Sequence, residues 1–424
     1  MTNEIKEIKP HKINDCQVSV PGSKSYTHRM LIAAALSDGI CTIKNALISE
    51  DTQFTIEALK QMGVQIEVRS DDMRVYGRNG RLGACSAPIY LGNSGTSMRL
   101  LTGVAALGKG TYTLTGTDRM QMRPIKDLLD ALQLIGVKAR SLKNNGCPPV
   151  AVTAAMISKD KVDINCQISS QYLSALLLIA PCTQNGLEIG VTGGPVSRPY
   201  VDLTTELMKT FGLRFEREDY RRFNVPGRQI YRAGEYAVEA DCSQAAYFWG
   251  AAAIGGADIK VMGVKADSAQ GDIRFVDLLQ RMGCRVSKTA DGIRVAGGSL
   301  CAIEADLADM PDQVPTLAVV AAFAEGTTVI KNVAHLKSKE SDRLSATVTE
   351  LKKMGIEAAC SENALVVEGG KPKGSIIDTY NDHRIAMSFA IAGLNVPGVS
   401  IRNESCVEKS FPAFWEVFEG LYQT

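Results

Sequence analysis

Hydrophobic and polar positions along the chain follow a pattern that returns every 71 to 76 residues. In each return an apolar residue stands four positions before a glycine and a second one stands directly before it, so both lie on one face of a helix. A glycine at this point suits the left-handed conformation that commonly ends a helix. The pattern therefore predicts five helices, which end at Gly63, Gly136, Gly212, Gly283 and Gly355.

The residues after these glycines, for example 64–68 and 137–140, alternate between apolar and polar types, which predicts a strand after each helix. The clearest helix is predicted to start at Pro124 and to carry Leu128 and Leu132 on its apolar face. A single βαβ unit takes only about 30 residues. The longer interval seen here therefore predicts repeats with two helices and several strands each.

A sixth return is expected near Gly420, but the sequence ends at Thr424 before another strand can follow. The N-terminal segment alternates in the same way around Ile5, Ile8 and Val18, and it is predicted to supply the missing strand. This closure divides the chain into two lobes of three repeats. We expect the first lobe to span residues 21–240, and the second to combine residues 1–20 with 241–424.

Composition narrows the class of protein. Hydrophobic residues make up 45% and charged residues 22% of the 424 positions, as in an ordinary globular protein. Lys and Arg number 47 and Asp and Glu 46, so no overall charge favours nucleic acid or an acidic membrane. We expect no membrane span, because the longest apolar stretch, 314–324, falls short of the ~18 residues needed. Eleven scattered cysteines without a C-x-x-C pair, and no recognisable targeting segment, favour a cytoplasmic protein with reduced thiols.

Small residues and cations stand together where several helices should begin, and a helix start binds anions through its unpaired N–H groups. Each segment is equally compatible with an ordinary capped turn or a solvated cation when taken alone. No metal-binding or hydrolase motif such as H-E-x-x-H or G-x-S-x-G is present. The segments of the first lobe are PGSKSYTHR (21–29), LGNSGTSMR (91–99), DRMQMRP (118–124), SSQY (169–172) and SRPY (197–200).

The second lobe adds carboxylates to this theme. Its segments are DMPDQVP (309–315), KSKESDRL (337–344) and YNDHR (380–384), and Asp309 or Asp312 could equally cap the helix that follows. We expect the cations of both lobes to meet in a cleft that binds two polyanions, with Asp312 and Glu340 as candidates for moving protons. These cations are Lys24, Arg29, Arg99, Arg119, Arg123, Arg198, Lys337, Lys339, Arg343, Arg384 and Lys409.

Nine segments, in order and over nearly the whole chain, resemble the motif series of the 3-phosphoshikimate 1-carboxyvinyltransferase (5-enolpyruvylshikimate-3-phosphate synthase) family. They are the segments above, read as PGSKSYTHR, LGNSGTSMRLL, RMQMRPI, SSQYL, SRPY, DMPDQVPT, KSKESDRL and YNDHRIAM, together with EKSFP (408–412). The resemblance implies an α/β fold of two inside-out domains, each with three βαβαββ repeats, joined by two crossover strands. It also implies transfer of the enolpyruvyl group of phosphoenolpyruvate to the 5-hydroxyl of shikimate 3-phosphate, with release of phosphate.

The same resemblance assigns roles to residues. Asp312, Glu340 and Lys24 are implied as catalytic groups, and His383 as an accessory group. The implied contacts to shikimate 3-phosphate are Lys24, Ser25, Arg29, Ser169, Ser170, Gln171, Ser197, Tyr200, Asp312 and Lys339. The implied contacts to phosphoenolpyruvate are Lys24, Asn93, Gly95, Arg123, Gln171, Arg343, Arg384 and Lys409. The family implies no cofactor and no metal, and we expect a monomer.

Some positions depart from the family's frequent pattern. Many members have an asparagine at or near the positions that Ala334 and His335 occupy in this chain. Ser94 and Ser97 replace alanines that are frequent in the family. Leu100 replaces a frequent proline; Gly95 leaves room for the inhibitor glyphosate, but sensitivity to it does not follow from the sequence. Two alternatives stay open. A UDP-N-acetylglucosamine enolpyruvyl transferase would share the fold, but would carry Lys-Asn in place of Lys24-Ser25 and a cysteine-bearing loop. A non-catalytic clamp of six units around DNA would place its cations along helix middles.

Overall fold

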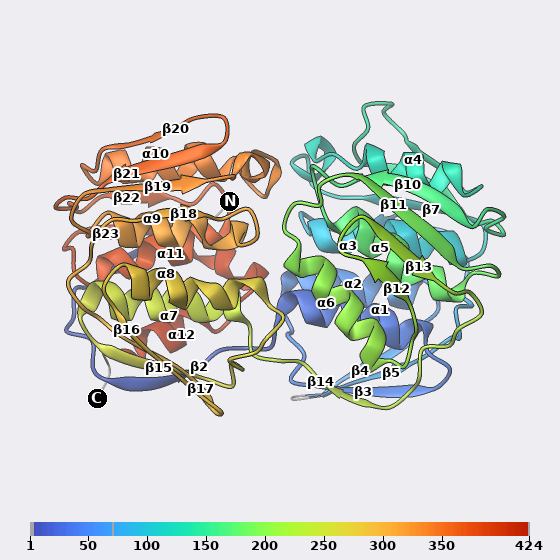
Figure 1. Ribbon diagram of the computed structural model, residues 1–424, viewed down its shortest axis with the longest axis horizontal. Coiled ribbons are helices and arrows are strands. Elements are labelled where there is room, and N and C mark those ends of the chain that lie inside the picture. The colour runs from blue at the N-terminus through green and yellow to red at the C-terminus, as the bar shows by residue number, and fades with distance from the viewer. Residues whose placement is uncertain (1–3, 70–71, 423–424) are drawn as a thin grey trace. The chain divides into compact units, whose positions relative to one another are not determined.

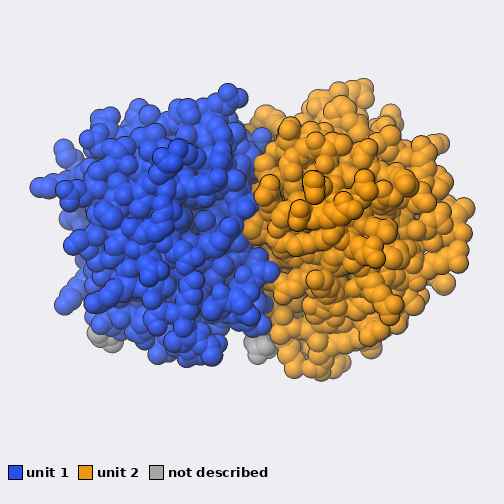
Figure 2. All heavy atoms as spheres, viewed as in Figure 1, with its two compact units in different colours: residues 1–21, 239–424 blue, residues 22–238 orange. Residues whose placement is uncertain are grey.

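The computed structural model describes residues 4–69 and 72–422. The chain forms two compact units (Figure 2): unit 1 comprises Met1–Pro21 and Glu239–Thr424, and unit 2 comprises Gly22–Val238. Unit 1 is thus built from both ends of the chain, and unit 2 from one continuous segment. That residues 21–240 and residues 1–20 with 241–424 form separate domains stays a prediction.

The described residues of unit 2 form six α-helices between short strands (Figure 1). In chain order its elements are α1 (Lys24–Leu36), β3 (Ile40–Lys44), α2 (Glu50–Gln61), β4 (Gln65–Val68), β5 (Asp72–Tyr76), β6 (Ile89–Tyr90), α3 (Gly95–Val104), η1 (Ala105–Leu107), β7 (Thr111–Thr115), η2 (Met120–Met122), α4 (Lys126–Leu134), β8 (Lys138–Ser141), β9 (Val150–Thr153), β10 (Lys161–Asn165), α5 (Gln171–Ile179), η3 (Ala180–Cys182), β11 (Leu187–Gly193), α6 (Pro199–Thr210), β12 (Glu216–Glu218), β13 (Arg222–Val225) and β14 (Glu235–Ala237).

Apart from two strands at its start, unit 1 has elements in the same order of α-helices and strands as unit 2 has from α1 to α6. They are β1 (Ile5–Ile8), β2 (Cys16–Ser19), α7 (Cys242–Gly255), β15 (Asp258–Met262), η4 (Gly271–Arg274), α8 (Phe275–Arg281), β16 (Arg285–Thr289), β17 (Gly292–Ala296), β18 (Glu304–Asp306), η5 (Pro311–Gln313), α9 (Val314–Ala321), β19 (Thr327–Lys331), η6 (Ala334–Ser338), α10 (Arg343–Lys353), β20 (Ala358–Cys360), β21 (Ala364–Glu368), β22 (Ile376–Asp378), α11 (His383–Gly393), β23 (Val399–Arg402), η7 (Glu404–Lys409) and α12 (Phe414–Glu419).

Each repeat has its own small sheet. Within the described residues, five sheets have four strands in one shared pattern, in which a first strand lies parallel to a second and the other two are antiparallel. In β6-β7-β9-β8, for instance, β6 and β7 are parallel and β7 and β9 antiparallel. The sixth sheet, β1-β23-β22, has three strands, and Ile5 of β1 stands opposite Arg402 of β23.

Two strands lie in the sheet of one unit and lead into a helix of the other. β2 pairs in parallel with β15 of unit 1, although α1 of unit 2 follows it in the chain. β14 pairs in parallel with β3 of unit 2, although α7 of unit 1 follows it. These two strands are the crossover connections between the units, as the fold class requires.

The predicted helix ends are confirmed. Gly63, Gly136, Gly212, Gly283 and Gly355 all have positive φ, at 84°, 95°, 81°, 109° and 75°. A residue with a side chain would be strained there, so glycine allows the chain to reverse from helix to strand. The predicted start of the helix at Pro124 is wrong by two residues. α4 begins at Lys126, because Ile125 is extended in φ, at −144°, and its N–H donates to the carbonyl of Gly146 at 2.9 Å.

The helices form the core of each unit, and the sheets lie outside them (Figure 1). The first helix of a repeat is buried on nearly all sides; every residue of α5 from Tyr172 to Ile179 is buried, as expected for a helix that is apolar all round. In unit 2, α5 packs on α3, and in unit 1, α11 packs on α7 and α9. The second helix of a repeat is amphipathic and nearer the surface, as in α4. No helix in the described part of the chain is long and apolar enough to cross a membrane.

Candidate functional site

In unit 2, a buried ion pair joins the starts of α1 and α2. Lys24 is the first residue of α1, and its Nζ lies 3.0 Å from Oδ2 of Asp51 in the first turn of α2. The two side chains are only 12% and 2% exposed, so Lys24 is not a solvated surface lysine. Asp51 was not among the residues expected from sequence. In the sequence, Asp51 is recognisable only as an acidic residue in the first turn of a helix. Ordinary helices also carry acidic residues there, so this position does not indicate a functional site.

Arg29 ties α1 to α6. Its guanidinium is fully buried and donates to the hydroxyl of Thr204 at 2.8 Å and to the carbonyls of Ser25 and Tyr200 at 3.0 and 3.2 Å. Burial lowers the pKa of Arg29 to about 10, so it remains charged at neutral pH. Contact of Arg29 with shikimate 3-phosphate stays a prediction.

The starts of α3 and α5 meet through Gln171. Gln171 is the first residue of α5; its Oε1 accepts from Nη1 of Arg99 at 2.8 Å and its Nε2 donates to Thr96 Oγ1 at 3.0 Å. Tyr172 donates its hydroxyl to the carbonyl of Pro124 at 2.6 Å, which brings in the segment before α4. Segments far apart in sequence therefore converge within unit 2.

Arg123 lies directly against the start of α3. Its Nη1 donates to the carbonyl oxygen of Asn93 at 2.9 Å and to Oδ1 of the same residue at 3.2 Å. A Cβ added to Gly95 would lie 2.5 Å from Nη2 of Arg123. A side chain at residue 95 would therefore displace this guanidinium from its position against the start of α3.

The other predicted residues of unit 2 also stand at helix starts. Ser169 Oγ accepts from the N–H of Gln171 at 3.2 Å, and Ser170 is the N-cap residue of α5. Ser197, which is buried with φ at 54°, and Tyr200 lie at the beginning of α6, and Ser25 lies in the first turn of α1. Within unit 2 the structure thus brings together the starts of helices that the sequence predicted to bind anions.

In unit 1, one carboxylate bridges two arginines. Oδ1 of Asp312 accepts from Arg343 Nη1 at 2.7 Å, and Oδ2 accepts from Arg384 Nη2 at 2.8 Å. Asp312 does not cap α9, whose N-cap residue is Gln313. Burial opposes the ionisation of Asp312, but Arg384, Arg343 and Lys339 hold its pKa well below the ordinary value. Asp312 is therefore ionised at neutral pH.

Arg343, the first residue of α10, is surrounded by carboxylates. Its Nε lies 2.8 Å from Oδ2 of Asp382, and its Nη2 lies 2.8 Å from Oε2 of Glu340. Burial opposes the charge of Arg343, yet Asp382, Glu340 and Asp312 together raise its pKa above the ordinary value. Asp382 also caps α11 by accepting from the N–H of Arg384 at 3.0 Å. Asp382 lies in the YNDHR segment, but sequence gave no reason to assign it an ionic partner.

The remaining predicted residues of unit 1 lie around this group. Nη1 of Arg384 donates to the hydroxyl of Tyr247 on α7 at 3.1 Å. His383, the first residue of α11, is buried, with Nδ1 3.7 Å from Oδ1 of Asp382. Lys339 is half-buried and interacts electrostatically with Asp312. Lys409, the last residue of η7, is buried.

Two further residues of unit 1, His335 and Asp272, interact electrostatically with this group of charged side chains. Burial and the charge of Lys339 lower the pKa of His335 to about 3, so its imidazole is neutral above pH 5. Asp272 of η4 is buried, accepts from the hydroxyl of Ser243, and interacts electrostatically with Asp312 and Arg384. Burial and Asp312 raise its pKa to about 6. Asp272 was missed from sequence, because an aspartate in the turn before α8 carries no local signal of burial.

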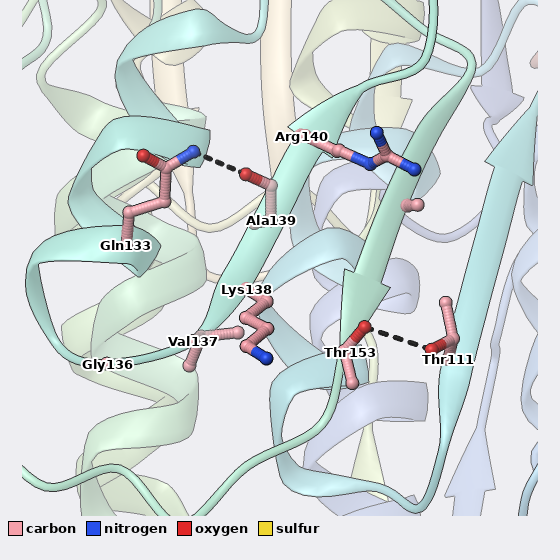
Figure 3. A pocket seen from close by; sticks show the side chains of 9 residues that line it. Thr111, Gln133, Gly136, Val137, Lys138, Ala139, Arg140 and Thr153 are labelled. Atoms are coloured by element: carbon pink, nitrogen blue, oxygen red, sulfur yellow. Dashed lines mark hydrogen bonds between the residues drawn. The ribbon is translucent and has the colours of Figure 1, made fainter.

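A pocket of about 670 Å³ lies elsewhere in unit 2, on the sheet that contains β7, β8 and β9 (Figure 3). Its lining includes Lys138 and Arg140 on β8, and Thr111 and Thr153, whose hydroxyls lie 2.9 Å apart. None of the predicted site residues lines it. Among the described residues no group of three or more His, Cys, Asp or Glu side chains could hold a metal ion.

Chemically, the candidate residues of the two units differ. The candidate residues of unit 2 are mainly cations and donors at helix starts, which suit phosphate and carboxylate groups. Unit 1 combines arginines with carboxylates, among them the ionised Asp312, which suit both anion binding and proton transfer. An α/β protein of two inside-out units with these groups has the features expected of an enzyme that handles phosphorylated acids.

Comparison with known proteins agrees with this class. The family model of EPSP synthase (3-phosphoshikimate 1-carboxyvinyltransferase) matches residues 8–418. The chain is 45% identical over 420 residues to the 3-phosphoshikimate 1-carboxyvinyltransferase of Syntrophobacter fumaroxidans, covering 98% of this chain and 99% of the relative. It is 41% identical over 419 residues to that of a Sulfurovum species, covering 98% of each. The chain therefore belongs to the EPSP synthase family.

Solved structures confirm the predicted fold class. EPSP synthase from Acinetobacter baumannii superposes with a TM-score of 0.83 at 29% identity, covering 100% of this chain and 99% of the other. The enolpyruvyl transferase NikO from Streptomyces tendae gives a TM-score of 0.78 at 21% identity, covering 99% and 98%, which shows the fold alone. Neither the UDP-N-acetylglucosamine transferase nor the clamp is favoured by these matches.

Proposed function

We propose that this protein transfers the enolpyruvyl group of phosphoenolpyruvate to the 5-hydroxyl of shikimate 3-phosphate, and releases inorganic phosphate. Membership of the EPSP synthase family supports this activity. The observation that carries it at the level of chemistry is the bridge from Arg343 through Asp312 to Arg384, with Glu340 on the same Arg343. It combines an ionised carboxylate with cations that a phosphorylated acid needs.

Shikimate 3-phosphate is proposed to bind through cations and hydroxyl groups at helix starts. Lys24, with its positive charge at the start of α1, and Arg29 provide charge for the phosphate group. The hydroxyls at the starts of α5 and α6 and the side chain of Gln171 provide donors and acceptors for the ring hydroxyls. The full proposed set is Lys24, Ser25, Arg29, Ser169, Ser170, Gln171, Ser197, Tyr200, Asp312 and Lys339.

Phosphoenolpyruvate is proposed to bind to the cations that end in planar guanidinium groups. Arg343 and Arg384 suit its carboxylate, because both already hold a carboxylate oxygen of Asp312 at hydrogen-bond distance. Arg123, held by Asn93 against Gly95, suits its phosphate. The full proposed set is Lys24, Asn93, Gly95, Arg123, Gln171, Arg343, Arg384 and Lys409.

Asp312 is proposed as the base that accepts the proton of the attacking 5-hydroxyl. A carboxylate with a strongly lowered pKa is a weak base, so this role requires that its arginines first move to the substrate. When phosphoenolpyruvate occupies Arg343 and Arg384, Asp312 loses the cations that stabilise its charge, and its pKa rises. The base is then activated only when the second substrate is bound.

Glu340 and Lys24 are proposed to manage the proton at the methylene carbon of phosphoenolpyruvate. Protonation of that carbon creates positive character at C2, and the 5-hydroxyl oxygen attacks C2 to form a tetrahedral intermediate. The C2–O bond to phosphate then breaks, and loss of a proton from the methyl group restores the double bond. Cations stabilise the departing phosphate. His383, buried beside Asp382, is proposed as an accessory group that supports Arg384.

The test is the release of inorganic phosphate from the purified protein with both substrates, in a buffer that contains EDTA. We expect turnover with the pair and none when either substrate is omitted. In a parallel reaction, UDP-N-acetylglucosamine replaces shikimate 3-phosphate. Turnover with the nucleotide sugar and none with shikimate 3-phosphate would contradict the proposal.

We also propose that the protein works as a monomer in the cytoplasm, without nucleic acid, membrane or cofactor. Eleven cysteines, all of them thiols, suit a reducing compartment. The balanced charge gives no general attraction to nucleic acid. Light scattering coupled to size-exclusion chromatography should give a mass near 45.6 kDa. A mass of twice that value would contradict the monomer.

A further inference from the structure

Four buried polar side chains, which we call the hydroxyl chain, connect the first three helices of unit 2. They are His28 on α1, Thr55 on α2, and Ser94 and Ser97 at the start of α3. Their exposure is 1% for His28 and 0% for the other three. Polar groups this deep in a core are costly unless they are hydrogen-bonded to one another.

The hydroxyl chain is continuous. His28 Nδ1 lies 2.8 Å from Thr55 Oγ1, Thr55 Oγ1 lies 2.8 Å from Ser97 Oγ, and Ser97 Oγ lies 2.7 Å from Ser94 Oγ. Ser97 Oγ also donates to the backbone carbonyl of Asp51 at 3.3 Å. One assignment of protons satisfies every contact: His28 donates to Thr55, Thr55 and Ser94 each donate to Ser97, and Ser97 donates to Asp51.

Two members of the hydroxyl chain, Ser97 and Ser94, lie beside candidate binding groups. The carbonyl that Ser97 reaches belongs to Asp51, whose side chain holds Lys24 at 3.0 Å. Ser94 lies between Asn93 and Gly95, which together hold Arg123. The hydroxyl chain therefore links the helix start that carries Lys24 to the helix start that positions Arg123.

The contact at Gly95 makes the position of Arg123 sensitive to the position of the start of α3. With the guanidinium of Arg123 against the backbone of Gly95, a small displacement of the start of α3 must displace Arg123 as well. Arg29, by contrast, is held by Thr204, Ser174 and Tyr200 of α5 and α6, outside the hydroxyl chain. A change in the hydroxyl chain should therefore affect Arg123 much more than Arg29.

We propose that Thr55 and Ser97 are positioning residues for phosphoenolpyruvate, since their hydroxyls fix the start of α3 and, through it, Arg123. The proposal rests on the proposed function, which assigns Asn93, Gly95 and Arg123 to phosphoenolpyruvate. Neither side chain touches the substrate; each acts through the backbone at 93–95.

The test compares Thr55→Val, which keeps the shape of the side chain and removes the hydroxyl, with Ser97→Ala. In each variant, KM for phosphoenolpyruvate should rise about tenfold, the effect of losing one buried hydrogen bond from a network. KM for shikimate 3-phosphate should rise clearly less, because Arg29, its buried cation, is held separately. In the double variant, KM for phosphoenolpyruvate should be only slightly higher than in the single variant with the higher KM, as expected for groups in one network. Thr55→Ser keeps a hydroxyl at this position, so its KM for phosphoenolpyruvate should match that of the wild type.

The matched control is Thr102→Val. Thr102 is also fully buried, lies on α3, and donates to the carbonyl of Met98 at 2.7 Å, outside the hydroxyl chain. We expect its KM for phosphoenolpyruvate to be unchanged. A general loosening of α3 would instead raise KM in this variant too, and that result would overturn the proposal.

Two other results would overturn it: unchanged KM for phosphoenolpyruvate in folded Ser97→Ala, or equal increases of KM for both substrates. Ser97→Ala only removes an oxygen atom, so it serves if Thr55→Val does not fold. A thermal-shift titration with phosphoenolpyruvate alone repeats the comparison without turnover. An inactive wild-type protein would count against the proposed function, whereas weaker binding by Ser97→Ala in that titration would still support the positioning role.

Discussion

At the scale of the residue, the environment of Asp312 explains how one carboxylate can serve two purposes. Its two oxygens accept from Arg343 and Arg384 at 2.7 and 2.8 Å, so it holds both guanidinium groups in place before substrate arrives. A substrate carboxylate can bridge the same two arginines with the same geometry. In the proposed mechanism, exchange of one carboxylate for another needs little rearrangement, and it converts a paired Asp312 into a base.

This exchange predicts the behaviour of Asp312→Asn. Loss of the base should lower kcat by about 100-fold or more, the typical contribution of general base catalysis. Phosphoenolpyruvate should bind as tightly as before or more tightly, because a competing charged carboxylate has been removed. Steady-state kinetics measures the first effect and calorimetric titration the second. Wild-type kcat would exclude Asp312 as the base, and weaker binding would contradict the exchange. Asp309→Asn, three residues earlier, is the control and should change neither quantity.

A second prediction concerns Asp272, whose pKa is raised to about 6 from 3.8. The neutral form of Asp272 favours the folded state, so this contribution is complete below pH 3.8 and is lost as the pH rises through 6. The Asp272→Asn variant has no carboxyl group at this position, so its stability lacks this dependence on pH. Between pH 5 and 7.5, the free energy of unfolding of the wild type should fall relative to that of the variant, by an amount on the order of 1 kcal/mol. Urea unfolding at both pH values measures this difference, and parallel pH profiles would contradict it.

At the scale of the element, β1 completes a sheet that the C-terminal part of the chain leaves short. β23 is followed by α12, and β1 pairs with β23 from the other end of the chain. Ile8 at the end of β1 is 3% exposed and packs against α11, where a Cβ on Gly393 would lie 2.5 Å from the Cβ of Ile8. Ile5 on the same strand is 49% exposed. The strand therefore has one side chain in the core and one at the surface.

This difference predicts the effect of two alanine substitutions in β1. Ile8→Ala should lower the free energy of unfolding by about 2–5 kcal/mol, since it leaves a cavity against α11. Ile5→Ala, the control on the same strand, should change it by less than about 0.5 kcal/mol. Urea denaturation of both variants measures the two values. Equal effects would mean that β1 does not pack through Ile8.

At the scale of the whole molecule, the order of the chain has a practical consequence. Unit 2 is one continuous segment, Gly22–Val238, whereas unit 1 needs both ends of the chain. α1, α3 and α5 give unit 2 a core of its own. Asp312 and Glu340 belong to unit 1, so a polypeptide of unit 2 keeps Lys24 but lacks both carboxylates that are proposed to transfer protons.

We therefore expect a polypeptide of residues 22–238 to fold by itself and to release no phosphate from the two substrates. Far-ultraviolet circular dichroism should show helical structure that unfolds in a single cooperative transition in urea. The full-length protein, prepared in the same way, is the control for activity. A gradual transition without a folded baseline would show that the unit depends on the rest of the chain.

Much of the fold could be predicted from sequence, because its signals are local. A glycine after an apolar face marks a helix end within a few residues, and all five such ends were placed correctly. The start of α4 was misplaced, because a proline favours a helix start but cannot show that Ile125 bonds to Gly146 instead. Most proposed binding residues were found in the same way, at helix starts with small residues and cations.

The sequence by itself determined the repeat, the buried helices and the residue types at their starts, since each depends on neighbours along the chain. Only the tertiary structure decided which charges meet. Asp51 pairs with Lys24 across 27 positions, Arg384 reaches Asp312 across 72, and Ser97 reaches Thr55 across 42. Asp272 gains its altered pKa from burial beside Asp312, 40 positions later in the chain. Such pairings depend on how the helices pack, and no local pattern of residues encodes them.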